Sequence, residues 1–238
     1  MHNFLQLEAT LEIPCAKDVS ILSCQFYASA YQDELFEELG VQYPVQLHGA
    51  VPKRRAEYLC GRYLARRLLE SRHASTLVTI GKFREPVWPE GWIGSITHTH
   101  NQAVCSLASR EKVAMLGIDM EPWFSDESSE QVSGQIVSSR ELRILQEIGS
   151  YSRALTLAFS AKESFFKAVF PTVRQYFGFD SVEVVELDLL RQRIGLRMNS
   201  SLSSFLETGS AFEVSYIYLP GDVFTLAILY QSSTSADL

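Results

Sequence analysis

Apolar residues repeat at helical spacing in three stretches of the chain. In residues 52–68 they recur every three or four positions, which is typical of a helix with one buried face, and the proline that opens this stretch suits a first helical turn. A longer helical pattern covers residues 151–170, and Pro171 is expected to end it. A shorter helix is predicted to begin where Ser138 and Glu141 have the spacing of a capping box.

Short apolar runs bounded by turn-forming residues predict strands between and after these helices. The last two strands are expected to form a hairpin that turns at Pro220-Gly221-Asp222. The first 50 residues are poorly patterned, with a short helix expected near residues 33–39, and the polar segment 125–139 is expected to be a mobile surface loop. The predicted strands are residues 77–80, 93–96, 103–108, 113–120, 182–187, 194–198, 212–219 and 223–230.

A helix followed by strands therefore occurs twice, which indicates an α+β fold with two roughly similar halves that meet near Glu121. We assign residues 1–118 to an N-terminal half and residues 119–238 to a C-terminal half. A chain of 238 residues is long enough for one sizeable domain or for two intimately packed halves.

The charge distribution favours a small phosphorylated ligand. The chain is acidic overall, with a formal net charge of −7, yet one stretch is rich in basic residues. Duplex nucleic acid usually needs a broad basic surface, so we expect no nucleic-acid partner. The basic residues of this stretch are Lys53, Arg54, Arg55, Arg62, Arg66, Arg67 and Arg72.

The cysteines and the hydropathy pattern indicate a cytoplasmic protein. Cys15, Cys24, Cys60 and Cys105 have no metal-binding or disulfide-framework spacing, so we expect reduced thiols. No signal-peptide pattern precedes them, and no run of about 18 apolar residues predicts a membrane span.

Two acidic segments carry the strongest chemical signal. Asp119 and Glu121 are two positions apart in a predicted strand, so both should face one side while Ile118 and Met120 face the core. Glu163 and Lys167 are four positions apart in a predicted helix and should share a face. Alone, the first pair is more often a solvated strand edge, and the second pair is more often a solvated helix face. Together, three carboxylates and a lysine in mostly apolar segments suggest a Mg²⁺ site that handles phosphate.

Other polar residues offer phosphate ligands. Thr97 and His98 end a predicted strand, and His98 is interpreted as a donor to a phosphate oxygen, although a structural role is also open. Zinc is disfavoured because no third ligand accompanies His98 and His100, and His100 is expected at the surface. Two or three of the arginines could grip a terminal phosphate, or they could form a solvated helix face. The segment Gly81–Glu85 could form a phosphate or adenine loop.

These motifs resemble those of the 4′-phosphopantetheinyl transferases, over about residues 52–180. Taken together, the GIDxE and FSAKES segments are specific to this family. Thr97 stands where many relatives have serine, so the hydroxyl is kept. The matching segments are Arg54-Arg55-Ala56-Glu57-Tyr58, Gly61-Arg62, Arg84-Glu85-Pro86-Val87-Trp88-Pro89, Gly94-Ser95-Ile96-Thr97-His98, Gly117-Ile118-Asp119-Met120-Glu121-Pro122, Phe159-Ser160-Ala161-Lys162-Glu163-Ser164-Phe165-Phe166-Lys167-Ala168 and Gly178-Phe179.

The resemblance implies a reaction and a fold. The phosphopantetheine arm of coenzyme A would be transferred to a serine of an acyl, peptidyl or aryl carrier protein, with release of 3′,5′-ADP. The route served would be the synthesis of a siderophore such as enterobactin or of another nonribosomal peptide. Family members of this length are monomers with two pseudo-two-fold-related halves and the active site between them.

The resemblance also implies residue roles. Mg²⁺ would be held by Asp119, Glu121 and Glu163, with Glu163 as the general base. Lys167 would contact the transferred phosphate, and His98 with Thr97 would hold the pyrophosphate. The expected catalytic residues are Glu163, Lys167 and His98. The expected coenzyme A contacts are Arg54 and Arg62 at the 3′-phosphate, Gly81, Lys82, Arg84 and Glu85 at the adenosine, and Thr97, His98, Asp119, Lys162, Glu163 and Lys167 elsewhere on the substrate.

Two other functions fit parts of the pattern. A non-catalytic protein that binds coenzyme A or docks carriers would not need the intact set of three acids. An unrelated Mg²⁺-dependent phosphohydrolase would be expected to carry a nucleotide-binding or hydrolase motif, and none occurs in the sequence. Segment 125–139 and the helix after it are expected to dock the carrier.

Overall fold

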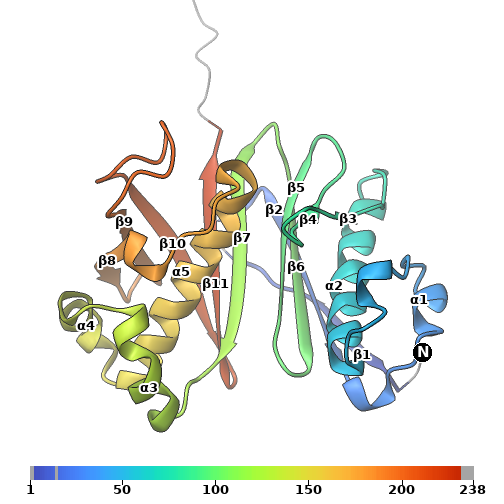
Figure 1. Cartoon of the computed structure of the whole chain (residues 1–238), viewed down its shortest axis with the longest axis horizontal. Helices are drawn as coiled ribbons and strands as arrows, with labels where there is room; N and C mark the ends of the chain where they lie inside the picture. The colour runs from blue at the N-terminus through green and yellow to red at the C-terminus, as the bar shows by residue number, and fades with distance from the viewer. Residues whose placement is uncertain (1–2, 14–15, 232–238) are drawn as a thin grey trace, which may run out of the picture. The chain divides into compact units, whose positions relative to one another are not determined.

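The computed structural model describes residues 3–13 and 16–231 and divides into two compact units (Figure 1). Of the described residues, the first unit contains those up to Leu116 and those at 228–231, and the second unit is Gly117–Ala227. Both units combine helices with antiparallel sheet, so the predicted α+β class is confirmed. The functional division at residues 118 and 119 and an active site between the halves stay predictions.

The first unit is a four-stranded antiparallel sheet covered by one long helix. The strand order is β1-β2-β6-β5, and α2 (Pro52–Glu70) packs against β2, β5 and β6. The predicted helix after Pro52 is thereby confirmed, and its apolar side chains lie in a core with those of the sheet. The strands are β1 (Leu5–Thr10), β2 (Val19–Phe26), β5 (Trp92–His98) and β6 (Gln102–Ser109), beside a two-stranded β3 (Thr79–Ile80) and β4 (Pro86–Val87).

The N-terminal strands were not predicted from the sequence. β2 pairs with both β1 and β6, so it is a central strand, and Ile21, Cys24 and Phe26 on it are buried. Its buried positions do not alternate regularly, and this is why its pattern gave no clear strand signal. The short helix expected near residues 33–39 is α1 (Leu35–Glu38). The strand predicted at 77–80 is shorter than expected, because pairing starts only at Thr79.

The second unit is a five-stranded sheet with three helices. Its strand order is β7-β11-β10-β9-β8, and α5 (Tyr151–Val173) contacts β10, α3 and α4 (Figure 1). The predicted turn before β11 is confirmed: Pro220-Gly221 links the two strands, with Gly221 at a φ of 91°. The strands are β7 (Val113–Pro122), β8 (Val182–Asp188), β9 (Arg193–Met198), β10 (Ala211–Leu219) and β11 (Asp222–Tyr230).

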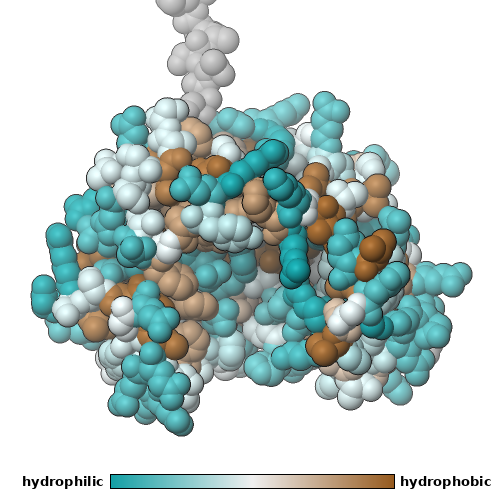
Figure 2. All heavy atoms as spheres, in the orientation of Figure 1, coloured by the Kyte–Doolittle hydropathy of each residue, from teal (hydrophilic) through white to brown (hydrophobic). Residues whose placement is uncertain are grey.

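Two helices of this unit depart from the sequence prediction. The segment expected to be a mobile loop contains the helix α3 (Asp126–Ile136), whose N-terminus is capped by the Ser125 side chain. Figure 2 shows hydrophilic side chains gathered over α3, and this polarity concealed the helical pattern. Pro171 does not end α5, because the helix continues for two residues beyond it, to Val173. The capping box of α4 (Ser139–Leu145) is confirmed.

The described cysteines are thiols in the core. Cys24, Cys60 and Cys105 are buried and free, as expected, and Cys15 lies outside the described residues. Burial raises the pKa of Cys60 and of Cys105, which keeps these thiols protonated and unreactive. No helix among residues 3–13 and 16–231 is long and apolar enough to cross a membrane.

The backbones of β7 and α5 approach closely at Gly117. A Cβ atom placed there would lie 2.0 Å from the carbonyl oxygen of Ser164 and 2.5 Å from the backbone nitrogen of Ala168. Because both atoms belong to the helix backbone, no side-chain rotation can relieve such a clash. Only glycine therefore permits this separation between strand and helix.

We predict opposite effects of two glycine-to-alanine substitutions. Gly117→Ala should lower the free energy of unfolding by about 1–3 kcal/mol or more, because the helix must move away from the strand. Gly134→Ala is the matched control, because Gly134 is exposed in α3 and has open space around it; it should stabilise the protein by about 0.5–1 kcal/mol. Urea unfolding of both variants measures this. Equal effects from the two substitutions would contradict the close approach.

Candidate active site

The acidic residues of β7 lie in a strand that is buried on both faces. Asp119 is only 2% exposed, while Glu121 is half-buried. Ile118 and Met120 are buried, as expected. Asp119 has the same parity in the strand as Gly117, over which α5 packs, so a helix covers this face of the strand and the alternative of a solvated strand edge does not apply to Asp119. A carboxylate in such a place needs compensating charge.

That compensating charge comes from α5. The Nζ atom of Lys167 lies 2.6 Å from Oδ1 of Asp119, so strand and helix meet through a charged hydrogen bond. Glu163 is one turn earlier on the same helix and is half-buried. The structure thus brings together residues that are more than 40 positions apart in the sequence.

The three carboxylates affect one another electrostatically. The pKa of Glu121 is raised to about 7, chiefly by burial and also by the negative charges of Asp119 and Glu163, against the opposing effect of Lys167. Burial likewise raises the pKa of Glu163, which Lys167 lowers and Asp119 raises. The region thus concentrates negative charge in poorly solvated surroundings, and an additional cation would stabilise it.

The donor set fits a hard cation such as Mg²⁺. Carboxylate oxygens are its usual protein ligands, and mutual repulsion among the three acids favours a divalent ion. No three acidic, histidine or cysteine side chains of the described ranges 3–13 and 16–231 form a group that could hold a metal ion by itself. Mg²⁺ is commonly held by one or two carboxylates together with water and substrate phosphates, so a complete cage is not required.

Lys162 lies in a buried network formed by the protein itself. Its Nζ atom is 2.7 Å from Oε1 of Glu141 and donates to the carbonyl oxygens of Ile136 and Phe179. Burial lowers the pKa of Lys162, and the Glu141 carboxylate opposes this shift. Glu141 also accepts hydrogen bonds from the backbone N–H groups of Ser138 and Val184. The pair therefore joins α5 to α4, β8 and the end of α3, and a contact of Lys162 with coenzyme A stays a prediction.

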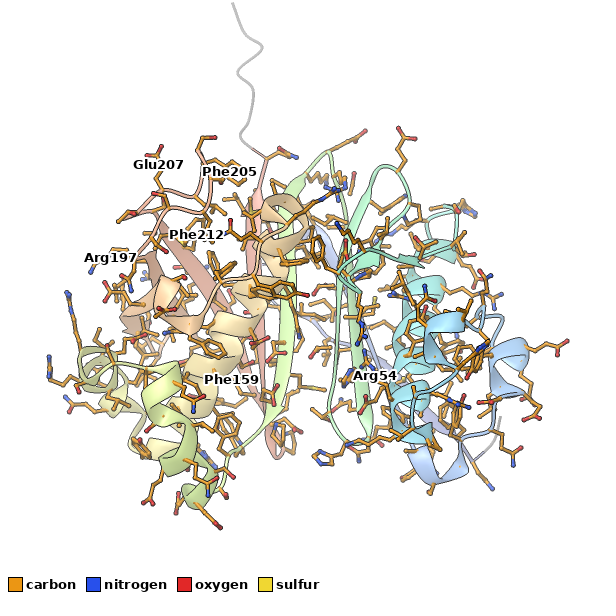
Figure 3. All side chains as sticks on the ribbon, in the orientation of Figure 1. Arg54, Phe159, Arg197, Phe205, Glu207 and Phe212 are labelled. Atoms are coloured by element: carbon orange, nitrogen blue, oxygen red, sulfur yellow. The ribbon has the colours of Figure 1, made fainter. Side chains whose placement is uncertain are left out.

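A second polar cluster lies in the first unit, where α2 meets the end of β5. Nη1 of Arg54 is 2.9 Å from Nε2 of His98 and 3.5 Å from Oε2 of Glu57 (Figure 3). Thr97, the residue before His98, is buried. His100 is exposed, as expected. Two residues predicted to contact phosphate are thus adjacent within this unit.

Most of the other arginines of the basic stretch have structural partners. They link α2 to neighbouring side chains, loops and strands. They therefore form neither a solvated helix face nor a phosphate-binding site. The pairs are Arg55 with Asp33 and the carbonyls of His48 and Ala50, Arg66 with Glu70 and the carbonyl of Leu39, Arg67 with Glu8 and Tyr63, and Arg72 with Ser20.

Arg62 is different because it is buried and lines a cavity of about 360 Å³. Its guanidinium lies 4.9 Å from the ring centre of Tyr58, and Nη2 donates to the carbonyl of Thr79. Its buried Nε atom has no hydrogen-bond partner among residues 3–13 and 16–231. A buried donor of this kind costs free energy unless a ligand or water satisfies it.

The segment Gly81–Glu85 forms a tight turn. The N–H of Gly81 donates to the carbonyl of Glu85, and the Glu85 carboxylate accepts from the N–H of Phe83. The same carboxylate lies over Gly81, where a Cβ atom would be 2.3 Å from it. Lys82 packs on the Phe83 ring, and Arg84 has a φ of 68°. Contacts of Gly81, Lys82, Arg84 and Glu85 with adenosine stay predictions.

An apolar pocket of about 290 Å³ opens beside Glu163 and Lys162. Aromatic rings form most of its wall, with Phe166 and Phe177 in contact at a centroid separation of 5.1 Å. The remaining lining residues are Tyr176, Gly178, Phe179 and Val182. An extended, uncharged chain would fit such a pocket.

Sequence comparison identifies the family. A sequence model of the 4'-phosphopantetheinyl transferase N-terminal domain matches residues 43–108, and a model of the 4'-phosphopantetheinyl transferase superfamily matches residues 115–217. Enterobactin synthase component D of Salmonella typhi is 36% identical over 68% of this chain and 67% of its own length. The chain belongs to the 4'-phosphopantetheinyl transferase superfamily.

Other relatives of this transferase are similar over shorter regions. Enterobactin synthase component D of Escherichia coli K12 is 40% identical over 52% of the chain and 58% of its own length. The 4'-phosphopantetheinyl transferase PptT of Mycobacterium tuberculosis is 29% identical over 57% of the chain and 60% of its own length.

Two acidic residues of the transferase were not singled out from its sequence. Glu57 was named only within a segment that matches the family, and Glu141 only as part of a helix cap. Each is nevertheless buried and paired with a cation. The pairing of Glu57 with Arg54 could have been predicted, because the two residues are three positions apart in a helix. Nothing in the sequence predicted that Glu141 pairs with Lys162.

We predict strong coupling between Lys162 and Glu141 in this transferase. Lys162→Met and Glu141→Gln should each lower the free energy of unfolding by about 3–5 kcal/mol, because each leaves a buried charge without its partner. The double variant should lose clearly less than the sum of the two. Glu70→Gln is the control, since it breaks an exposed pair with Arg66 and should cost less than about 1 kcal/mol. Additive losses in denaturant unfolding would contradict the coupling.

Proposed function

We propose that this transferase moves the 4′-phosphopantetheine group of coenzyme A to a serine of an apo carrier protein and releases 3′,5′-ADP. The observation that carries the proposal is the charged contact between β7 and α5. There Lys167 pairs with Asp119, and the charges of these residues shift the pKa of Glu121 and of Glu163. The names of the enterobactin synthase relatives support a role in siderophore or nonribosomal peptide synthesis.

The first unit would bind the nucleotide end of coenzyme A. Arg54 and Arg62 would contact the 3′-phosphate, and the cavity beside Arg62, with its unsatisfied Nε atom, supports this assignment. His98 and Thr97 would contact the pyrophosphate, and the turn Gly81–Glu85 would lie at the adenosine.

The second unit would bind the reacting end. The aromatic pocket beside Glu163 suits the pantetheine arm, which is long and uncharged. Asp119, Glu121 and Glu163 would hold Mg²⁺, which when bound would neutralise the developing charge on the diphosphate. Lys162 would contribute by fixing the helix turn on which Glu163 stands.

Glu163 would act as the general base. Its place beside the pocket suits an incoming serine. The serine oxygen would attack the phosphorus that bears the pantetheine arm, and its proton would pass to Glu163. As the diphosphate P–O bond breaks, Lys167 would turn from Asp119 toward the phosphate oxygens and stabilise the departing 3′,5′-ADP.

Carrier docking would involve α3 and α4. The exposed acids Asp126, Glu127 and Glu130 on α3 and the basic residues Arg140 and Arg143 on α4 would give this face both signs of charge. Such a face would orient an incoming carrier.

Incubation of apo carrier proteins with coenzyme A and Mg²⁺ tests the proposal. Mass spectrometry should show that a carrier gains one phosphopantetheine group, and chelation of the metal should prevent this. Glu163→Gln should lower the rate by about 100-fold or more through loss of the base. Glu207→Gln, a change of an exposed loop acid, should leave the rate unchanged. No mass gain on any of several carriers by folded protein, or full activity of Glu163→Gln, would refute the proposal.

A further inference from the structure

Glu57 is a buried acid that no step of the proposed reaction uses. It is 8% exposed and lies on α2, within the first unit. A carboxylate removed from water in this way needs positively charged or donor groups around it. Two residues proposed to bind phosphate, Arg54 and His98, lie near this carboxylate.

Two cationic side chains and the ring of His98 lie near this carboxylate. Oε2 lies 3.5 Å from Nη1 of Arg54 and 3.7 Å from Nε2 of His98, and Oε1 lies 4.0 Å from Nζ of Lys53. Arg54 and Lys53 have side chains that are more than half exposed, whereas Glu57 is held in the helix packing. Glu57 is therefore the fixed member of the group.

Arg54 contacts both this fixed acid and His98. A guanidinium only donates hydrogen bonds, so the 2.9 Å contact requires Nε2 of His98 to accept. Both of these contacts of Arg54 use Nη1, and the guanidinium has other N–H groups that can turn toward a phosphate. The carboxylate orients Arg54 from one side, and the N–H groups on the other side of the guanidinium can still bind an anion.

We propose that Glu57 is a positioning residue that holds Arg54 against His98 and so sets the affinity for the phosphates of coenzyme A. The inference rests on the proposed function, because it assumes that Arg54 contacts this substrate. An exposed arginine loses side-chain freedom when it binds an anion, and a carboxylate that orients it beforehand reduces that loss.

A purely electrostatic view predicts the opposite effect. Glu57 carries the same sign of charge as a phosphate, so its removal would strengthen binding if net charge alone decided affinity. A phosphate bound by Arg54 would lie on the far side of the guanidinium from Glu57, so its repulsion by Glu57 acts over a longer distance than the attraction between Glu57 and Arg54, whose atoms are 3.5 Å apart. We therefore expect orientation to outweigh repulsion.

Glu57→Gln tests the proposal in steady-state kinetics with a carrier protein. We expect the KM for coenzyme A to rise by about threefold to tenfold, with kcat within about twofold of the wild-type value. In an Arg54→Ala background the same substitution should change KM by less than about twofold, because its target is gone. Glu8→Gln is the matched control: Glu8 also holds α2 through an arginine, Arg67, and its loss should not alter KM.

The outcomes separate this inference from the proposed function. Wild-type protein that neither binds coenzyme A nor modifies a carrier would refute the proposed function. An active wild type with unchanged or lower KM in Glu57→Gln, or an equal rise of KM in the Arg54→Ala background, would overturn only the role of Glu57. If Glu57→Gln does not fold, Glu57→Asp is judged by the same criteria. Failure of both to fold would assign Glu57 to stability and overturn the proposal.

Discussion

The close packing of α5 on β7 at Gly117 is the constraint on which the second unit depends. Because the strand lacks a side chain at this position, the helix backbone lies within contact distance of it. Asp119 is two residues further along the strand and is thereby buried against the helix that carries Lys167. Because this packing excludes solvent from Asp119, its carboxylate needs a positive charge nearby. The close packing at Gly117 therefore accounts both for the burial of Asp119 and for its pairing with Lys167.

α5 contributes to two buried ionic groups that have different roles. Lys162 and Glu141 are almost fully buried and satisfy each other and the backbone groups around them, so their role is to hold helices and sheet together. Asp119, Glu121 and Glu163 outnumber Lys167, and burial together with repulsion among these acids raises the pKa of Glu121 and of Glu163. An excess of negative charge lowers stability but favours a divalent cation, which is the compromise expected of a catalytic site. The neighbouring residues Lys162 and Glu163 thus serve structure and chemistry respectively.

The sequence predicted elements with strong local signals and missed features set by distant contacts. The helix after Pro52, the capping box at Ser138 and the hairpin at Gly221 were all predicted correctly, because their determinants are adjacent in the chain. β2 was missed because burial on both faces removes its alternation. The polar helix α3 was mistaken for a loop because it offers few apolar positions.

The same distinction applies to the functional residues. The acids of β7 and α5 were recognised from short motifs, but only the fold shows that Asp119 is buried and bonded to Lys167. The basic stretch looked uniform in sequence, although its partners lie far away: Glu8 is 59 residues from Arg67, and Asp33 is 22 residues from Arg55. Once these pairs are made, Arg54 and Arg62 remain as candidates for phosphate.

A crystal structure with coenzyme A and Mn²⁺ in place of Mg²⁺ tests the central claim most directly, because anomalous scattering locates the ion. The account predicts one metal peak at about 2.0–2.3 Å from carboxylate oxygens of β7 and α5, shared with the diphosphate. A metal and diphosphate bound away from Asp119, Glu121 and Glu163 would contradict it.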